Sequence, residues 1–196
     1  NMNVHTARKQ LGKALAFEHP IDADVVTGVP DSSLSAAIGY AEATSLPYEL
    51  GLIKSRYVGR TFIEPSQSLR EQGVKLKLSA VRGVVEGKRV VMVDDSFVRG
   101  TTSRRLTKLL REAGATEVHV LIASPPIKYP CHYGMDTLRT DELVASNYDL
   151  EEMRAMIGAD SLCFLSVENT IEILGQGLCL ACFTGNYPVE GEDSHV

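Results

Sequence analysis

The chain has 196 residues, of which 44% are hydrophobic, a composition that favours a globule with one sizeable folded core over disorder. Its 25 acidic and 20 basic residues give a formal net charge of -5, which supplies no general positive field for nucleic acid. No apolar run approaches the roughly 20 residues that span a bilayer, and residues 1–12 show no secretory signal. These properties predict a cytoplasmic protein that binds neither nucleic acid nor membranes.

The first strand and helix are predicted near the beginning of the chain. Residues 24–29 form a short β-branched run, residues 30–32 have turn chemistry, and apolar residues at helical spacing begin at Leu34. Residues 47–53 are predicted as the next strand. The order strand, helix, strand is typical of a parallel crossover unit.

A second unit of the same kind begins at residues 89–93, a nearly continuous apolar run typical of a buried parallel strand. Leu106 and Leu110 then lie on one face of a helix that Gly114 is placed to end, and residues 117–122 resume strand. Two such units predict an α/β fold with a mostly parallel sheet flanked by helices.

Residues 54–80 lie between the two units and show no clean periodicity. A segment of this length without a pattern is either a solvated surface excursion or a binding loop, and both interpretations remain open on residue pattern alone.

The chain after Pro125 is predicted to consist of shorter pieces. These include a helix over residues 150–157 that Gly158 closes and a strand over residues 162–166, which together suggest a cap on the sheet. We expect residues 1–174 to form the main domain, followed by a cysteine-containing segment and tail over residues 175–196 that serves as a small C-terminal cap.

An anion site is predicted where the second buried strand meets its helix. Backbone N–H groups and the positive end of the helix converge at this loop, and Gly100 permits close approach of a ligand. The hydroxyls of Ser96, Thr101 and Thr102 can donate to phosphate oxygens. Charge-assisted hydrogen bonds contribute roughly 1.5–3 kcal/mol each, so four or five account for most of the roughly 8 kcal/mol of micromolar binding.

Asp94 and Asp95 precede this loop at the carboxyl end of the strand, where open α/β sheets place their ligands. An isolated acidic pair more often caps a helix or a turn, but such a pair can also hold ribose hydroxyls and assist Mg²⁺ binding. The serine, arginine, glycine and two threonines that follow make the pattern stricter than a glycine-rich loop alone, and so favour the binding role.

Residues 90–102 resemble the signature with which type I phosphoribosyltransferases bind phosphoribosyl diphosphate (PRPP). Residues 28–33, 52–63 and 93–105 extend the resemblance over nearly the whole chain to one branch, the glutamine PRPP amidotransferases. This branch transfers the phosphoribosyl group to ammonia, giving 5-phosphoribosylamine and diphosphate in the first committed step of purine synthesis.

The resemblance implies a role for each part of the site. Ser32 would help on the metal and diphosphate side, and Asp94 and Asp95 would engage ribose and Mg²⁺. Residues 54–61 resemble a loop that closes over PRPP, with Lys54 also meeting inhibitory purine nucleotides. The residues that would grip the 5′-phosphate are Ser96, Val98, Arg99, Gly100, Thr101 and Thr102. The further catalytic residues would be Arg56, Tyr57 and Arg60.

Three of the four cysteines form a candidate metal site. Cys179 and Cys182 have a spacing shared by zinc and iron–sulfur sites, and Cys131 can supply a third thiolate; spacing alone leaves zinc, a cluster and no metal open. The resemblance implies that the three bind a 4Fe–4S cluster whose fourth ligand lies outside this chain. Cys163 lies in an apolar run and is expected to be a small buried hydrophobe. The histidines are expected to be surface or packing residues: His5, His19, His119, His132 and His195.

The amidotransferase family also has an amino-terminal glutaminase domain that begins with a nucleophilic cysteine. This chain begins with Asn1 and resembles the later half only, so we expect the glutaminase domain to be absent here and the complete enzyme to be a homo-oligomer. Two alternatives remain, a free-base salvage phosphoribosyltransferase and a non-catalytic PRPP or nucleotide sensor. The cationic loop at residues 56–61 favours an enzyme over a sensor, and the cysteine pattern favours an amidotransferase over a salvage enzyme.

Overall fold

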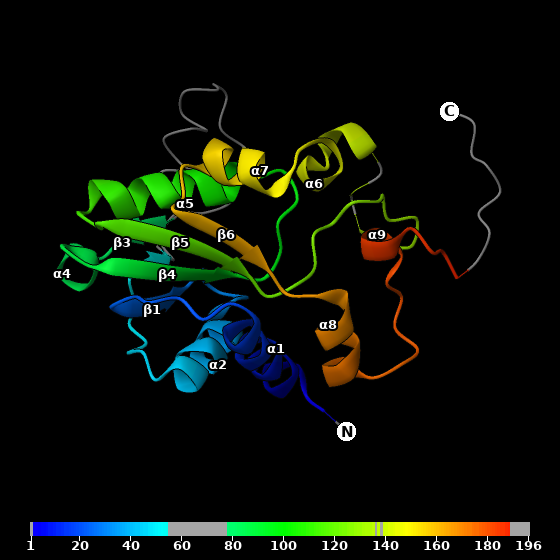
Figure 1. The fold of residues 1–196 in the computed structure, drawn as a ribbon, viewed down its shortest axis with the longest axis horizontal. Coiled ribbons are helices and arrows are strands. Elements are labelled where there is room, and N and C mark those ends of the chain that lie inside the picture. The colour runs from blue at the N-terminus through cyan, green and yellow to red at the C-terminus, as the bar shows by residue number, and fades with distance from the viewer. Residues whose placement is uncertain (1, 55–77, 136, 138, 189–196) are drawn as a thin grey trace.

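The computed structural model describes residues 2–54, 78–135, 137 and 139–188. Within these residues the main sheet has four strands in the order β1-β4-β5-β6, and every pairing is parallel. The strands are β1 (Val25–Gly28), β4 (Arg89–Asp94), β5 (Glu117–Ile122) and β6 (Ser161–Phe164). The predicted α/β fold with a parallel sheet flanked by helices is confirmed (Figure 1).

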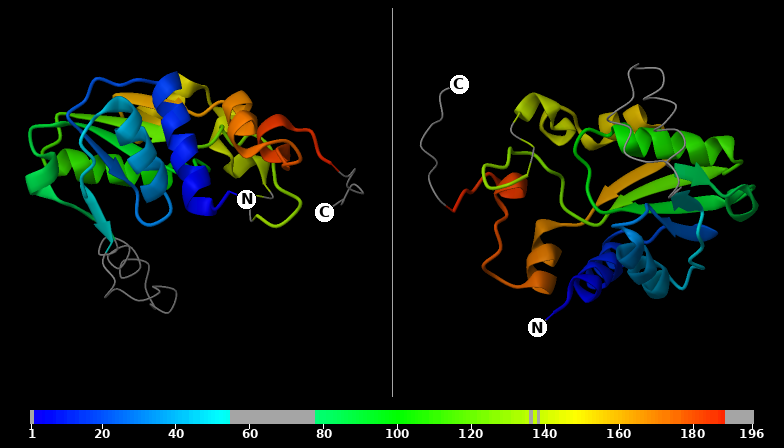
Figure 2. Two further views of the ribbon diagram at one scale, coloured as in Figure 1. Left: turned by 90° about the horizontal axis from the view of Figure 1, so that it is seen from below. Right: turned by 180° about the vertical axis from the view of Figure 1, so that it is seen from behind.

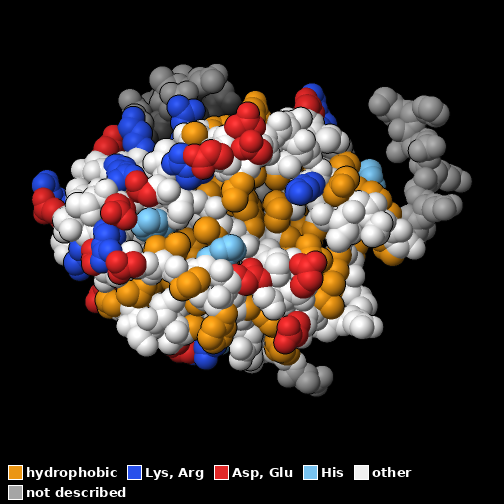
Figure 3. All heavy atoms as spheres, viewed as in Figure 1, with side chains coloured by type: hydrophobic (Ala, Val, Ile, Leu, Met, Phe, Trp, Pro, Cys, Tyr) orange, Lys and Arg blue, Asp and Glu red, His pale blue; other side chains and the backbone are white. Residues whose placement is uncertain are grey.

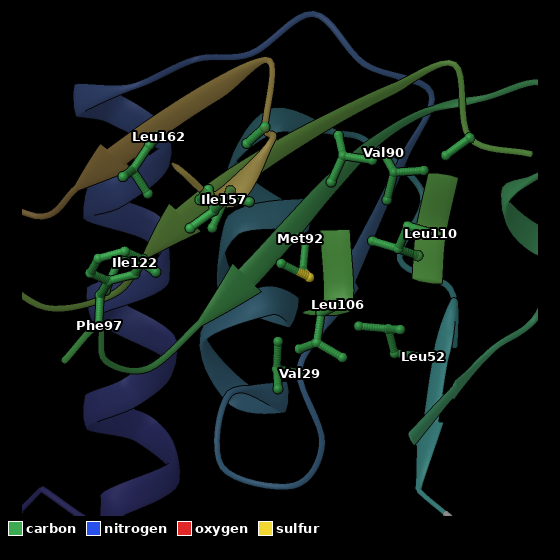
Figure 4. Close-up of a cluster of buried hydrophobic side chains, with 14 of the residues drawn as sticks. Val29, Leu52, Val90, Met92, Phe97, Leu106, Leu110, Ile122, Ile157 and Leu162 are labelled. Atoms are coloured by element: carbon green, nitrogen blue, oxygen red, sulfur yellow. The ribbon is translucent and has the colours of Figure 1, made fainter. Parts of the chain in front are cut away.

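Helices cover both faces of this sheet, as Figures 1 and 2 show. On one face lie α1 (Val4–Glu18) and α2 (Leu34–Thr44), and on the other lie α5 (Thr101–Glu112) and α7 (Leu150–Ile157). Successive side chains of a strand point to opposite faces, so β4 contributes to both cores. Val90 and Met92 pack with Leu106 on the α5 face (Figure 4), whereas Val91 packs with Tyr40 on the α2 face.

Helix α1 has no counterpart among the predicted elements. Its buried residues are Gly12, Leu15 and Ala16, and a face built mainly from small residues gives little hydrophobic periodicity. A Cβ added at Gly12 would lie 1.9 Å from the Ala36 carbonyl oxygen, so only glycine permits this approach to α2.

The elements on either side of the predicted phosphate loop agree with the sequence to within a residue or two. Strand β4, helix α5 and strand β5 occupy the predicted positions, and Gly114 follows α5 with a positive φ of 100°. Helix α7 covers the predicted residues and ends at Gly158, whose φ is 72°. These elements are specified locally, by apolar runs and by glycines at helix ends.

Two predicted strands are placed differently by the structure. The strand expected over residues 47–53 contacts β1 through one bridge, Tyr48 to Val26, and continues into β2 (Leu52–Lys54). That strand pairs antiparallel with β3 (Leu78–Ala80) in a separate two-stranded sheet. The strand expected over residues 162–166 is β6, which extends the main sheet instead of capping it.

Shorter elements complete the described chain. Ser166 begins α8 (Val167–Leu174), because its side chain accepts a hydrogen bond from the Asn169 N–H at 3.1 Å. The remaining short helices are α4 (Arg82–Val85), η2 (Thr140–Glu142), α6 (Val144–Asn147) and α9 (Ala181–Thr184). Across residues 2–54, 78–135 and 139–188, none of the helices has the length and apolar character needed to cross a bilayer.

Candidate functional site

A cavity of about 340 Å³ opens at the carboxyl edge of the sheet, where β1 and β4 end. It brings together the predicted phosphate loop, the acidic pair and Ser32. Its lining residues are Val29, Ser32, Asp94, Asp95, Ser96, Phe97, Val98, Arg99, Gly100, Thr101, Thr102 and Ser103. Residues far apart in sequence meet here because the carboxyl ends of neighbouring parallel strands share one edge.

The amino-terminal end of α5 faces this cavity without a side-chain cap. Gly100 is the N-cap residue, with φ 69° and no side chain to accept from the first turn, and that turn contains no acidic residue. The N–H groups of Thr101, Thr102 and Ser103 have no acceptor among the described residues. Free amides and the positive end of the helix dipole together favour an anion.

The amino-terminal end of α7 provides a contrast within the same molecule. There Asp149 accepts from the Glu152 N–H at 2.8 Å, and Glu152 accepts from the Asp149 N–H at 2.9 Å. This capping box satisfies the N–H groups of Glu152 and Asp149 and places carboxylates at the helix start, where they disfavour a further anion. A second hollow of about 460 Å³ borders this end, and hydrophobic side chains gather around it on the face below α6 and α7 (Figure 3). The uncapped end of α5 therefore favours an anion more than the capped end of α7 does.

The two aspartates of the acidic pair have different surroundings. Asp94 is 6% exposed, and its Oδ1 accepts from the Ser33 hydroxyl and from the Asp95 N–H, both at 2.9 Å. Burial raises the pKa of Asp94 to about 6; the nearby negative charge of Asp95 adds to this, and the two hydrogen bonds oppose it. Asp95 is partly exposed and accepts from the Ser96 hydroxyl at 3.1 Å.

The side chain of Arg99 pairs with Glu142, and Arg99 also lines the cavity. Its Nε donates to the Glu142 carboxylate at 3.0 Å, and its Nη2 contacts the same oxygen. The Val144 N–H also donates to the Val98 carbonyl at 3.0 Å, so the segment around η2 is attached to the predicted phosphate loop at two points. The sequence contained no local signal for Glu142 in this role, because the two partners are 43 residues apart.

Lys54 and Arg8 contact the loop between β1 and α2. The Lys54 ammonium lies 2.6 Å from the Asp31 carboxylate, next to Ser32. Arg8 of α1 donates from Nη1 to the Ser32 carbonyl at 3.0 Å. Sequence reasoning thus missed Arg8 and Ser33. The predicted catalytic residues Arg56, Tyr57 and Arg60 lie outside the described residues.

The cysteine segment lies apart from this cavity, around α9. Backbone N–H groups of Tyr133, Met135 and Gly134 lower the pKa of the Cys131 thiol. Burial raises the pKa of Cys182, and the neighbouring Cys131 contributes in the same direction. Among the described residues no three His, Cys, Asp or Glu side chains converge on a single metal ion. Cys163, on β6, is partly buried.

The acidic pair and the uncapped end of α5 lie together at the carboxyl edge of a parallel sheet. This arrangement is typical of proteins that bind phosphorylated ligands. Residues 3–133 match the model of the phosphoribosyl transferase domain family, and the chain belongs to that family.

Particular relatives are named amidophosphoribosyltransferase. That of Bacillus subtilis (strain 168) is 70% identical over 196 residues, covering 96% of this chain and 41% of the relative. The chloroplastic amidophosphoribosyltransferase 1 of Arabidopsis thaliana is 56% identical over 197 residues, covering 99% of this chain and 35% of the relative. The chain thus spans less than half the length of these relatives.

A solved structure is similar throughout the chain. It is the glutamine PRPP amidotransferase from B. subtilis complexed with ADP and GMP, with a TM-score of 0.89 and 68% identity. The match covers 99% of this chain and 44% of the solved one.

Proposed function

We propose that this chain binds PRPP in the cavity at the edge of the sheet and transfers its phosphoribosyl group to ammonia, with release of diphosphate. The observation that carries the proposal is the uncapped end of α5 beside the acidic pair. The names of the relatives support the choice of PRPP and of the amidotransferase reaction.

Each wall of the cavity would bind one part of PRPP. The free amides of residues 101–103 and the hydroxyls of Thr101 and Thr102 would hold the 5′-phosphate, together with the loop from Ser96 to Gly100. Asp94 and Asp95 would accept hydrogen bonds from the ribose hydroxyls. Arg99, which also lines the cavity, would bind with this loop, and its bond to Glu142 would support the loop.

Mg²⁺ fits the diphosphate side of this cavity. Ser32 and Asp95 line it with oxygen donors, and Mg²⁺ is commonly bound by one or two carboxylates together with substrate phosphates rather than by a complete protein cage. Bound there, the ion would neutralise part of the charge that develops on diphosphate.

The reaction needs no nucleophile from the protein. The ammonia nitrogen forms a bond to the anomeric carbon, the bond from that carbon to diphosphate oxygen breaks, and the electron pair leaves with diphosphate. The amine then loses a proton to solvent. The chain's own groups hold the phosphate and ribose, so that the anomeric carbon is fixed while it gains oxocarbenium character.

PRPP binding can be tested by titration calorimetry in the presence of Mg²⁺. We expect Asp95→Asn and Thr101→Val to weaken PRPP binding about tenfold or more, because each removes a charged or phosphate-directed hydrogen bond. Thr116→Val is a suitable control, since Thr116 follows α5 at the opposite end from the cavity. Wild-type affinity in both site variants would exclude this cavity as the PRPP site.

The ammonia donor can be tested by diphosphate release. We propose that residues 1–174 form the transferase domain and that glutamine hydrolysis belongs to a part of the relatives that this chain does not match. We therefore expect release with ammonium salts at alkaline pH and none with glutamine. Release that requires a purine or pyrimidine base would favour the salvage enzyme instead, and PRPP binding without turnover would favour the sensor.

We also propose that Cys131, Cys179 and Cys182 bind a 4Fe–4S cluster. The backbone donors to the Cys131 sulfur favour its thiolate, and each cluster cysteine ligates a separate iron, so convergence on one ion is not required.

Iron and sulfide analysis after anaerobic reconstitution tests the cluster. We expect a substoichiometric content, because four ligands are normally needed and Cys163 lies on β6 among apolar residues. Cys131→Ser should lower the content further, whereas Cys163→Ser should leave it unchanged. Dependence on Cys163 would contradict this ligand set.

Two further proposals concern binding partners. Lys54 would meet purine nucleotides, which is supported by its position beside the Asp31–Ser32 loop and by the ADP and GMP in the similar B. subtilis structure. Assembly of several copies remains a prediction from the resemblance.

A further inference from the structure

Ser33 is a fully buried serine at the start of α2, with 0% of its surface exposed. A serine at this position normally accepts a hydrogen bond from an amide of the first turn, which stabilises a helix by about 1 kcal/mol. Ser33 makes no such bond. Its hydroxyl donates instead to Asp94 Oδ1 at 2.9 Å, across 61 residues of sequence. The Ser33 side chain thus contacts the acidic pair instead of capping the helix.

The hydrogen bonds to Asp94 fall on one of its two carboxylate oxygens. Oδ1 accepts from the Ser33 hydroxyl and also from the Asp95 N–H at 2.9 Å. Oδ2 has no hydrogen-bond partner among the described residues, and Asp94 lines the cavity. Two donors on one oxygen restrict rotation of the carboxylate and leave the other oxygen for a ligand.

Ser33 also belongs to the loop that forms the opposite wall. Its N–H donates to the Val29 carbonyl at 3.3 Å, and the preceding Ser32, which lines the cavity, is held by Arg8 through its carbonyl at 3.0 Å. The Ser33 hydroxyl therefore links the β1–α2 loop to Asp94 at the carboxyl end of β4, in addition to the backbone bond from the Val29 N–H to the Val93 carbonyl.

We propose that Ser33 is a positioning residue that holds the Asp94 carboxylate with Oδ2 presented to the ribose of PRPP, an inference that rests on the proposed PRPP site. The 5′-phosphate would be held at the amino-terminal end of α5, whereas the Ser33 hydroxyl donates to Asp94. Loss of the hydroxyl should therefore weaken binding of the sugar while leaving binding of a free phosphate at α5 unchanged.

The test compares Ser33→Ala, Ser33→Thr and wild type for the dissociation constant of PRPP and for competition by inorganic phosphate. We expect Ser33→Ala to bind PRPP about tenfold more weakly, as for loss of one hydrogen bond to a charged group, with an unchanged phosphate constant. Ser33→Thr restores the hydroxyl and should recover most of the affinity. Ser35→Ala is the matched control, because the Ser35 hydroxyl contacts only His5 among the described residues.

Three results would overturn the inference: wild-type PRPP affinity in Ser33→Ala, an equal loss of PRPP and phosphate binding, or a loss in Ser33→Thr as large as in Ser33→Ala. Circular dichroism of each variant shows whether the fold is retained. Failure of wild type to bind PRPP would instead refute the proposed function, so the two failures are distinguishable.

Discussion

Asp94→Asn is expected to raise the free energy of unfolding at neutral pH while it removes PRPP binding. Burial raises the pKa of Asp94 in the folded protein to about 6, above its ordinary value of 3.8. Between these two values the unfolded chain has released the proton and the folded chain retains it, so wild-type stability falls as pH rises from about 4 to about 6. Above about pH 6 the folded protein holds Asp94 as a buried, ionised carboxylate, and the destabilisation has reached its full size.

The size of this effect follows from the shift. Each pKa unit corresponds to about 1.4 kcal/mol, so we expect Asp94→Asn to be more stable than wild type by about 1–3 kcal/mol above pH 7 and equal to it below pH 4. Urea denaturation at several pH values measures the difference. If PRPP and Mg²⁺ bind at the proposed site, they should raise the unfolding temperature of wild type, and loss of the carboxylate should remove that increase.

Asp24→Asn is a control for which the expected change in stability at neutral pH has the opposite sign. Hydrogen bonds from the Arg89 side chain and backbone lower the pKa of Asp24 to about 2. Its charge therefore stabilises the fold at neutral pH, and this contribution is lost as pH falls from about 4 through 2. Asp24→Asn should be less stable than wild type at pH 7 with unchanged PRPP binding. A destabilised Asp94→Asn at pH 7 would contradict the assigned cost of burying that carboxylate.

Gly100→Ala is expected to lower PRPP affinity by at least about tenfold, because it disturbs the amides that would hold the 5′-phosphate. Gly100 has a φ of 69°, which costs an L-residue about 1–2 kcal/mol. A Cβ there would also lie 3.1 Å from Cζ of Phe97, which is 2% exposed and packs edge-on against Phe164. The loop must move to relieve this contact.

Gly87→Ala separates backbone strain from the effect on the site. Gly87 has a φ of 72°, and a Cβ there would meet no atom within 4 Å. It lies between α4 and β4, away from the residues that line the cavity. Both variants should lose stability in urea, Gly100→Ala by more because of its contact with Phe97, but only Gly100→Ala should lose PRPP affinity in calorimetry. Equal affinities in the two variants would show that the Gly100 backbone does not position the ligand.

Local sequence patterns predicted the elements around the site. The apolar run of β4, the helical spacing of α5 and the glycine after it each lie within a dozen neighbouring residues. Their physical causes are also local, since strand burial, helix amphipathicity and positive φ at glycine act over one or two turns of chain. For this reason the strand and helix that flank the predicted phosphate loop and the acidic pair could be placed from the sequence.

The sequence predicted which strands pair less well than it predicted where the strands lie. The central strands are apolar on both faces, and such runs carry no alternation that specifies neighbours. The chain over residues 47–53 therefore looked like a member of the main sheet, although β2 pairs with β3. Likewise β6 looked like part of a cap, although it pairs with β5.

The sequence alone determined the chemical kind of site: an acidic pair at a strand end, followed by a glycine and hydroxyls at a helix start. Only the tertiary structure decided how these groups are held. Asp94 is fixed by Ser33 from another strand–helix unit, and Arg99 is turned toward Glu142. Such contacts join residues 61 and 43 positions apart, and they form only once the strand order brings those segments to one edge.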